Sequence, residues 1–405
     1  MKRDREVEDW IERAKATDIW RALDRCLTNH GVRRKGHKGA GPCPACGGKD
    51  RFSINGQKQN WWCRKSQKGG GPIDLAMYVT GANFLGACEI LTGESMPKPP
   101  KPGEEVRRED PKLVEQRRLD AEAEAERRKQ EQIKWRDRER NKARDIWGEG
   151  EVLIGTPAEE YLRSLRGVQP PEGARLRYHP NLKYWHSVDG EWTVLHTGPA
   201  LLARIDDNQN RFIGCHCTYI DLSRRKGKVA IIDPATGEVL DAKKVRGSQK
   251  GGHIHLGGSP AACDRLIMGE GIETTLSMRE AMVWDKRDVS TTLFWAAVNL
   301  GNIGGPAAGS IVHPTARIKD KLGRERKVKV AGPDPDMATT DPVLIPPDNI
   351  NRIVLLGDSD GDLFATGQHL LRAGRRWRRP GRETAIAWPD GAADFNDILL
   401  QGAGA

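Results

Sequence analysis

Residues 352–362 form the stretch that most constrains the fold, and they read Arg-Ile-Val-Leu-Leu-Gly-Asp-Ser-Asp-Gly-Asp. The apolar run is typical of a buried parallel strand, and in open α/β sheets ligands bind just beyond the carboxyl ends of such strands. Three carboxylates, Asp358, Asp360 and Asp362, stand at that end. They repel one another unless a cation neutralises them, and hard oxygen ligands suit Mg²⁺ or Mn²⁺. The stretch therefore predicts a metal site; an Asp-rich turn that caps the following helix is the alternative.

A glutamate follows another apolar run of the same kind. Residues 265–271 read Arg-Leu-Ile-Met-Gly-Glu-Gly and lead into a helical pattern, so Glu270 also stands at the end of a predicted strand. Two more strands are expected at 291–298 and 384–388. Strands that alternate with helices imply a mainly parallel sheet. Glu270 would then lie at the same sheet edge as the aspartates, which favours the metal site over the turn.

The N-terminal part contains a cysteine pattern typical of a zinc ribbon. Cys43 and Cys46 form a C-x₂-C turn beside glycine and proline, and Cys63 stands where the second half of a ribbon would begin. The position expected for the fourth ligand holds Ser66, and serine is a poor zinc ligand. We predict a bound Zn²⁺ whose fourth ligand is His37, another group or a water. The alternative is a metal-free remnant held together by its apolar core.

Cationic and aromatic side chains are interleaved with these cysteines. Arg51, Phe52, Trp61 and Trp62 are the main candidates for contacts with nucleic acid. Aromatic rings on which bases stack, beside cations that pair with phosphates, make up a platform for single-stranded nucleic acid. The alternative is that the aromatic rings are the core of a very small domain.

Composition limits the cellular setting and the partners. The 405 residues carry a net charge of +10, which is compatible with a polyanionic partner such as nucleic acid. No apolar run reaches membrane-spanning length and the first residues lack a signal-peptide core, so we expect a cytoplasmic protein without a membrane segment. Its eight cysteines should then be reduced. The sequence has no G-x-x-x-x-G-K-[ST] motif, which argues against a built-in ATPase motor.

The predicted fold class is a multidomain α/β protein. A helix with one apolar face and a zinc-ribbon-like β domain are expected over 1–96, and a charged helical or partly disordered spacer over 97–146. A basic middle region of mixed α+β structure is expected over 147–260. The C-terminal domain, 261–405, should hold the mainly parallel sheet, with a polar, basic and proline-rich insertion at about 311–349.

The middle region offers a basic, glycine-rich stretch. Lys243, Lys244, Arg246 and Lys250 are candidates for contacts with phosphates of a template or an incoming nucleotide, and an ordinary exposed loop is the alternative. Residues 215–217 read Cys-His-Cys, but alternation along a strand sends the two cysteines to one face and the histidine to the other. We therefore expect core cysteines beside a strand histidine rather than a metal cluster.

These motifs together resemble a known family. A strand with Glu-Gly, and much later a strand with Asp-x-Asp-x-Asp, is similar to the Toprim fold of bacterial primases, topoisomerases, small nucleases and recombination proteins. The order of zinc ribbon, basic middle region and Toprim domain resembles bacterial and phage primases. Further similarity to primases of phages and mobile elements lies in Gly-Pro-Cys-Pro-x-Cys-Gly-Gly-x-Asp-Arg-Phe, Tyr178-His-Pro, Cys217-Thr-Tyr and Gly-Glu-Gly-Ile-Glu-Thr. The resemblance covers most of the chain outside the spacer and the insertion, and Ser66 departs from it.

The resemblance implies metal-dependent synthesis of a short RNA primer on single-stranded DNA from nucleoside triphosphates. Glu270 would act near the reacting 3′-hydroxyl as a base or metal organiser. Asp358 and Asp360 would hold the divalent ions, with Asp362 as a further ligand. The ribbon would help to choose where synthesis starts. Since no motor motif is present, a separate replicative helicase is the expected partner.

Two other classes of protein stay open. A Toprim nuclease or topoisomerase would use the same carboxylates to break a phosphodiester, although a topoisomerase needs a nucleophilic tyrosine in a further large domain and a nuclease needs no ribbon. The second class is a non-catalytic replication protein that binds single-stranded nucleic acid with a decayed site. Intact Glu270, Asp358 and Asp360 argue against decay, whereas Ser66 is consistent with it. Asp394 and Asp397 either support the metal site or cap the final helix.

Overall fold

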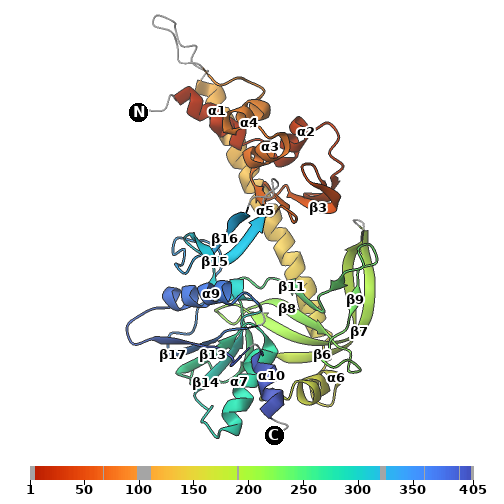
Figure 1. Cartoon of the computed structure of the whole chain (residues 1–405), viewed down its shortest axis with the longest axis vertical. Coiled ribbons are helices and arrows are strands. Elements are labelled where there is room, and N and C mark those ends of the chain that lie inside the picture. The colour runs from red at the N-terminus through yellow and green to blue at the C-terminus, as the bar shows by residue number, and fades with distance from the viewer. Residues whose placement is uncertain are drawn as a thin grey trace, which may run out of the picture. The chain divides into compact units, whose positions relative to one another are not determined.

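The chain divides into two compact units in its computed structural model. Its described residues are 5–66, 68–97, 111–188, 191–319, 325–359, 361–391 and 393–402. The units comprise residues 1–134 and 135–405, and the long helix α5 (Pro111–Gly148) crosses the boundary between them (Figure 1). Helices and strands occur in both units, so the expected mixed α/β class is confirmed.

The N-terminal unit packs short helices against a small antiparallel sheet. The helices are α1 (Arg5–Lys15), α2 (Ile19–Cys26), α3 (Pro72–Thr80) and α4 (Phe84–Thr92). The strands are β1 (Arg33–Lys35), β2 (Lys38–Cys43), β3 (Gly47–Asn55), β4 (Asn60–Cys63) and β5 (Lys68–Gly70), paired in that order. The apolar face expected near the N-terminus is divided between α1 and α2 because Asp18 caps α2, where its carboxylate accepts the Trp20 amide at 3.0 Å.

Aromatic and aliphatic side chains fill the core of this unit. Trp10 and Leu23 from the helices are buried against Phe52 and Trp61 from the sheet. Helices α3 and α4 form an apolar pair, bent by 108°, that together have the length and composition of a membrane span, whereas no single helix among the described residues has them.

The C-terminal unit contains two large sheets. The first is antiparallel, has the order β11-β8-β7-β6, and comprises β6 (Leu176–Val188), β7 (Glu191–Asp206), β8 (Phe212–Tyr219) and β11 (Lys243–Gly247). A small pair, β9 (Ile231–Ile232) and β10 (Val239–Leu240), stands between β8 and β11 in the sequence. Before this sheet, α6 (Pro157–Glu160) continues into one π-helical turn, Tyr161–Leu165.

The second sheet is mainly parallel, as expected. Its order is β12-β14-β13-β17-β18, and the strands are β12 (Ile254–Gly257), β13 (Arg265–Gly269), β14 (Thr292–Ala296), β17 (Arg352–Leu356) and β18 (Glu383–Ala387). All neighbours are parallel except β12, which pairs with β14 in the antiparallel direction. The four parallel strands therefore present their carboxyl ends at one edge.

Alternation along the parallel strands divides their side chains between two cores. One face, with Ile267, Phe294 and Leu356, packs on α7 (Ile272–Trp284) and α10 (Phe395–Gly402) and also on the antiparallel sheet. The opposite face, with Leu266, Leu293 and Leu355, packs on α8 (Leu300–Gly304) and α9 (Leu363–Arg376). The helices lie on both sides of the sheet in Figure 1. The middle and C-terminal regions thus share one core.

The expected insertion forms a β-hairpin. Strands β15 (Ser310–Lys319) and β16 (Glu325–Ala331) pair in the antiparallel direction as a separate two-stranded sheet. In Figure 1 the hairpin stands beside α9. Loops connect it to α8 and β17, so it is inserted between two neighbouring segments of the parallel sheet domain.

Candidate active site and metal centre

Two carboxylates expected in the active site lie at the same edge of the parallel sheet. Strands β13 and β17 are direct neighbours, with Met268 opposite Leu355 in the ladder, and Glu270 and Asp358 follow these strands. Both side chains line one cavity of about 610 Å³. The third expected ligand, Asp360, lies outside the described residues.

Asp394 brings a further carboxylate to this cavity. Its Oδ1 accepts a hydrogen bond from the Asp397 amide at 2.6 Å, so it caps the start of α10, and it also lines the cavity. The loop after β17 is tied to the same segment, because Ser359 Oγ donates to the Ala393 carbonyl oxygen at 2.7 Å. Asp394 thus caps the helix and also lines the cavity, and its support of a metal site stays a prediction.

Asp362 serves as the N-cap of α9. Its Oδ1 accepts hydrogen bonds from the Ala365 amide at 3.0 Å and from His313 Nε2 at 3.1 Å. The Ala365 amide and then His313 hold the pKa of Asp362 below its usual range. Asp362 is described by the structure but lies outside the lining of the cavity. Its role as a metal ligand stays a prediction.

Basic side chains form the wall of the cavity that comes from the middle region. The lining cations are Arg166, Lys226, Lys228, Lys243 and Lys244, with His216 beside them. Carboxylates at the sheet edge therefore face a set of lysines across a space large enough for a nucleotide-sized ligand. Such a site offers oxygen ligands for a hard cation and ammonium groups for phosphates.

Glu273, in the first turn of α7, holds two of these lysines. Lys228 Nζ lies 2.9 Å from Glu273 Oε1, and Lys243 Nζ lies 3.7 Å from Oε2. The Tyr161 hydroxyl donates to Oε1 at 2.7 Å. Segments far apart in the sequence thus converge on one buried carboxylate, which fixes the positions of both ammonium groups.

The pKa values of this cluster follow from burial and from the charges inside it. Burial alone would raise the pKa of Glu273, but Lys243, Lys228 and the Tyr161 hydroxyl hold it well below its usual range. Glu273 raises the pKa of Lys243 against the effect of burial. For Lys228 burial dominates and lowers the pKa, although Glu273 opposes this effect. Burial, together with Glu273, raises the pKa of Tyr161.

The alternation expected at residues 215–217 is confirmed. Cys215 and Cys217 are buried in the core beneath the antiparallel sheet, with their sulfur atoms 4.0 Å apart, while His216 lines the cavity. Burial and then the nearby Lys243 lower the pKa of His216 to about 4. The imidazole is therefore neutral at physiological pH and adds no charge to the basic wall.

The four basic residues predicted in the middle region have different surroundings. Lys243 and Lys244 line the cavity, and the Lys244 ammonium also lies 4.6 Å from the ring centre of Tyr184. Arg246 lies on β11 outside the lining. Lys250 forms an exposed ion pair with Asp341 at 2.9 Å. Direct contact with a ligand in the cavity is thus open to the two lysines alone among these four.

Several lining residues were not predicted from the sequence. These are Arg166, Lys226, Lys228, Glu273 and Asn396. The basic run Arg-Arg-Lys-Gly-Lys at 224–228 was a signal for two of them, and the second glutamate of Gly-Glu-Gly-Ile-Glu-Thr was a signal for Glu273. Arg166 and Asn396 are linked by a hydrogen bond from Asn396 Nδ2 to the Arg166 carbonyl at 2.6 Å, and nothing local in the sequence indicates that contact.

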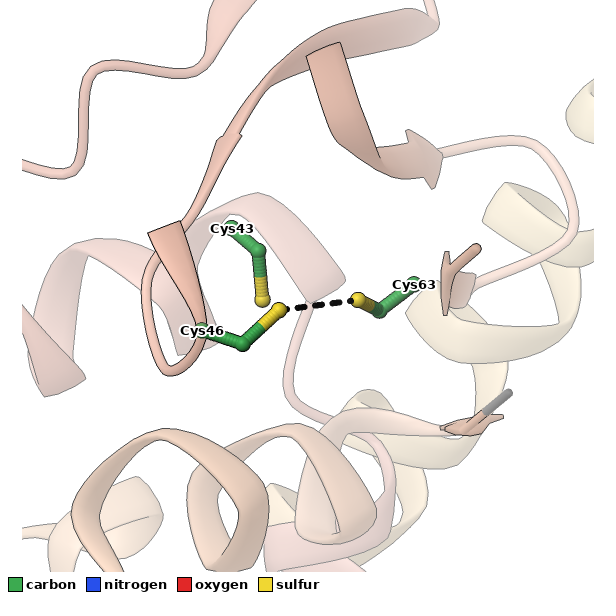
Figure 2. Close-up of side chains that lie close together, drawn as sticks. All are labelled: Cys43, Cys46 and Cys63. Carbon is green, nitrogen blue, oxygen red and sulfur yellow. Dashed lines mark hydrogen bonds between the residues drawn. The ribbon is translucent and has the colours of Figure 1, made fainter. Parts of the chain in front are cut away.

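The cysteine cluster expected in the N-terminal unit is formed. The sulfur atoms of Cys43, Cys46 and Cys63 lie within 4.8 Å of one another, and Figure 2 shows the three side chains pointing toward a common centre. The Cys46 and Cys63 sulfurs are 3.5 Å apart. Thiolates around a tetrahedral Zn²⁺ lie about 3.8 Å apart, as bond lengths of ~2.3 Å require. The donor set therefore suits Zn²⁺.

The fourth side of the cluster is polar. The Tyr78 hydroxyl donates to Ser66 Oγ at 2.9 Å and lies 3.2 Å from Cys43 Sγ. Burial would raise the pKa of Cys63, but hydrogen bonds from the Ser66 hydroxyl and amide lower it to about 6, which favours a thiolate. His37, the alternative fourth ligand, instead lies 3.3 Å from Glu131.

The expectation of an aromatic platform needs correction for two residues. Phe52 and Trp61 are buried in the core, where their rings stack at 5.5 Å, because they alternate inward on β3 and β4. They cannot stack with bases. Trp62 points to the other face of β4 and is 44% exposed. Arg51 is half-buried on β3.

Comparison with known proteins gives one family model. A domain of unknown function (DUF7146) matches residues 137–256, less than half of the chain, from the end of α5 to β12. No curated protein matches the chain. The matched segment supplies Lys228 and Lys243 of the cavity but not the carboxylates of the parallel sheet.

Among solved structures, three similar ones are primase fragments. The zinc-binding and RNA polymerase domains of the Aquifex aeolicus primase are 14% identical at a TM-score of 0.33, covering 97% of this chain and 82% of that one. The primase fragment of the bacteriophage T7 primase-helicase protein is 13% identical at 0.32, covering 90% and 94%. The DnaG catalytic core is 12% identical at 0.34, covering 66% and 75%.

Proposed function

We propose that this chain is a DNA primase of the phage or mobile-element variety, with a Toprim catalytic domain that synthesises short RNA primers on single-stranded DNA. The observation that carries the proposal is the common cavity of Glu270 and Asp358, which follow neighbouring parallel strands and face a wall of lysines. Carboxylates that gather metal ions and ammonium groups that hold a triphosphate are the parts that nucleotidyl transfer needs.

Glu270, Asp358 and Asp360 would hold Mg²⁺ or Mn²⁺, with Asp394 on the same wall and Asp362 as a further candidate. The bound ions would supply activation of the 3′-hydroxyl and neutralisation of charge on the triphosphate and pyrophosphate. Glu270 accepts the proton of the attacking hydroxyl or orients that hydroxyl. Carboxylate oxygens at the carboxyl edge of a parallel sheet are rigidly positioned, which is what an in-line displacement requires.

The lysine wall would bind the phosphates of the incoming nucleotide. Lys228 and Lys243 are already placed by Glu273, so binding does not have to order two long, flexible side chains. Lys244 adds a third cation to the lining. Arg246 and Lys250, outside the lining, stay candidates for the template.

The N-terminal unit would select the start site. A Zn²⁺ held by Cys43, Cys46 and Cys63 would fix the sheet on which Arg51 and the exposed Trp62 contact single-stranded template. Unwinding would come from a separate replicative helicase, and co-purification of such a protein tests this partner.

Synthesis on a defined template tests the proposal. Purified protein, single-stranded DNA, labelled ribonucleotides and Mg²⁺ or Mn²⁺ should give short oligomers, and Asp358→Asn should reduce their yield by about 10³-fold or more. The variant keeps the shape of the side chain while it removes the charge. Ser359→Ala, next to it in the same loop, serves as the matched control and should keep synthesis within about tenfold, because one hydrogen bond contributes about 1 kcal/mol.

Template cleavage without synthesis would overturn the proposal and favour a Toprim nuclease. Binding of single-stranded DNA with neither reaction, in both metals, would favour a non-catalytic binding protein. Equal activity of the wild type and Asp358→Asn would remove Asp358 from the site.

A further inference from the structure

The hairpin of β15 and β16 is anchored beside the candidate active site. His313 in β15 is buried, and its Nδ1 accepts the amides of Thr315 and Ala316 at 3.2 and 2.8 Å. Nε2 therefore carries the proton and donates to Asp362 Oδ1 at 3.1 Å. Asp362 lies in the loop that also contains Asp358, so the base of the hairpin contacts the loop of a candidate metal ligand.

Arginines of α9 hold the second strand of the hairpin. Arg372 is 1% exposed and donates to the carbonyl oxygens of Ala331 and Gly332 at the end of β16. Arg375 forms an ion pair with Asp334 just beyond it. A buried guanidinium whose donors are engaged by backbone carbonyls fixes that backbone in place. Both strands are therefore attached to α9, and the orientation of the hairpin relative to this helix is fixed.

Beyond this base, the hairpin is rich in cations. The described strands, 310–319 and 325–331, contain one acidic residue, Glu325, and the basic residues Arg317, Lys319, Arg326, Lys327 and Lys329. Lys327 and Lys329 alternate on β16 and are exposed. Arg317 stands directly opposite Lys327 in the ladder. The Arg317 guanidinium donates to the carbonyl oxygens of Pro314 and Ala316. The exposed Lys327 and Lys329 are therefore the side chains that offer charge to an anionic partner outside the hairpin.

The kind of anion follows from what the hairpin lacks in its described strands. Residues 310–319 and 325–331 contain no Phe, Trp or Tyr on which a base could stack. An RNA–DNA hybrid is close to A-form, and proteins recognise such a duplex mostly through its shape and backbone. Cations without aromatic rings suit a phosphate backbone rather than unpaired bases.

We propose that the β15–β16 hairpin binds the phosphate backbone of the duplex that template and new primer form. This inference rests on the proposed primase function, because only a synthesising enzyme carries a growing duplex away from its metal site. The contact of His313 with Asp362 attaches the base of the hairpin to the loop that contains Asp358, where that duplex would begin.

Direct binding measurements test the hairpin. The full chain and its Lys327→Gln/Lys329→Gln variant are titrated, without triphosphates, against a preformed RNA–DNA hybrid with a single-stranded template extension and against the single strand alone. Fluorescence anisotropy gives the affinity over a range of NaCl concentrations. The variant should bind the hybrid about tenfold more weakly, with a salt slope lower by about 0.9 for each lost phosphate contact, and bind the single strand as the wild type does.

The matched control removes two exposed cations at the opposite edge of the sheet. Arg287 follows α7 and Arg378 follows α9, and each precedes a parallel strand, so Arg287→Gln/Arg378→Gln changes net charge equally at the amino ends of the strands. It should bind the hybrid as the wild type does, and Lys327→Arg/Lys329→Arg should retain hybrid affinity.

Three results would overturn the hairpin proposal. These are unchanged hybrid affinity in the glutamine variant, an equal loss for hybrid and single strand, and an equal loss in the control variant. Absence of primer synthesis by the wild type would instead overturn the proposed function, and the binding assay, which contains no triphosphates, is read independently of it.

Discussion

At the scale of single residues, Glu273 is the group on which the basic wall depends. It is buried, charged and surrounded by two ammonium groups and a phenol. Removal of one partner from a buried ion pair leaves the other charge uncompensated. The two lysines would then keep their places less well and lose their protons more easily.

Nucleotide binding should weaken as pH rises and the lysines lose their protons. We therefore expect Glu273→Gln to lower the pH at which this loss of binding occurs. Burial already lowers the pKa of Lys228 and Glu273 opposes that effect, so its removal lowers the pKa further. Phosphate binding needs the protonated lysine, and it disappears as pH rises through this pKa. At a pH of about 9 the variant should bind ATP about tenfold more weakly than the wild type, as titration calorimetry across pH would show.

Tyr161→Phe is the control for this experiment, because it removes the hydrogen bond to Glu273 but keeps the charge. Its pH profile should follow that of the wild type. A profile of Glu273→Gln that coincides with the wild type would show that Lys228 does not bind the phosphates.

Residues of the site were predictable where a local pattern carries the information. Glu270 and Asp358 follow apolar runs that predict strands, and the two cysteines of 215–217 follow simple alternation. The partners Tyr161, Lys228 and Glu273 were not predicted, because three segments meet only through the fold. Asp362 has both the spacing of a ligand and that of a cap, and its bond to the Ala365 amide comes only from the structure.

At the scale of elements, α9 connects the loop after β17 with the β15–β16 hairpin. Its N-cap, Asp362, accepts the Ala365 amide, and its later turns hold β16 through Arg372. We expect Asp362→Ala to reduce the free energy of unfolding by about 2 kcal/mol, because it removes the cap and leaves the buried His313 Nε2 without its acceptor. Asp362→Asn should reduce it by only a few tenths of a kcal/mol, since asparagine also caps and keeps an acceptor oxygen. Denaturant unfolding measures both changes.

The same pair of variants separates capping from metal binding. If Asp362 is a cap alone, both variants need the same Mg²⁺ concentration for primer synthesis as the wild type. A raised Mg²⁺ requirement in Asp362→Asn, with stability unchanged, would make Asp362 a ligand.

Elements were predictable to different degrees. The parallel strands were expected within about two residues of their observed bounds, because buried strands read as apolar runs between turn signals. The hairpin β15–β16 was expected only as an insertion, since its alternating basic and aliphatic residues have no buried face to reveal them. The break between α1 and α2 depends on one capping residue, Asp18, in an otherwise continuous helical pattern.

At the scale of the whole molecule, the two units should unfold separately. Each has its own core, and the candidate zinc site belongs to the N-terminal unit. Calorimetry should show two unfolding transitions, and a zinc chelator should lower the midpoint temperature of the N-terminal unit alone. Zinc at a hundred times its Kd contributes about 2.7 kcal/mol to that unit. Ser66→Cys, which completes a Cys₄ set, should raise the midpoint temperature of the same transition.

Cys43→Ser is the control, because the transition of its N-terminal unit should occur at the same temperature with and without chelator. A single transition in the wild type, or a chelator effect on both transitions, would contradict separate units with one structural metal.

Division into units was not fully predictable from the sequence. The charged composition of 97–146 indicates a spacer, but the common core of the middle and C-terminal regions depends on long-range packing, such as that of Leu201 in one cluster with residues of the parallel sheet.

The strand order also determines when during synthesis of the chain the carboxylate pair can exist. β13 leaves the ribosome well before β17, and until then its only parallel neighbour is β14. Closing the long loop between β13 and β17 is entropically costly, so this ladder forms late. A nascent chain that ends before β17 holds Glu270 without Asp358 and cannot capture a divalent ion between them. Under the proposed function, metal binding by this pair therefore has to follow the pairing of β17 with β13.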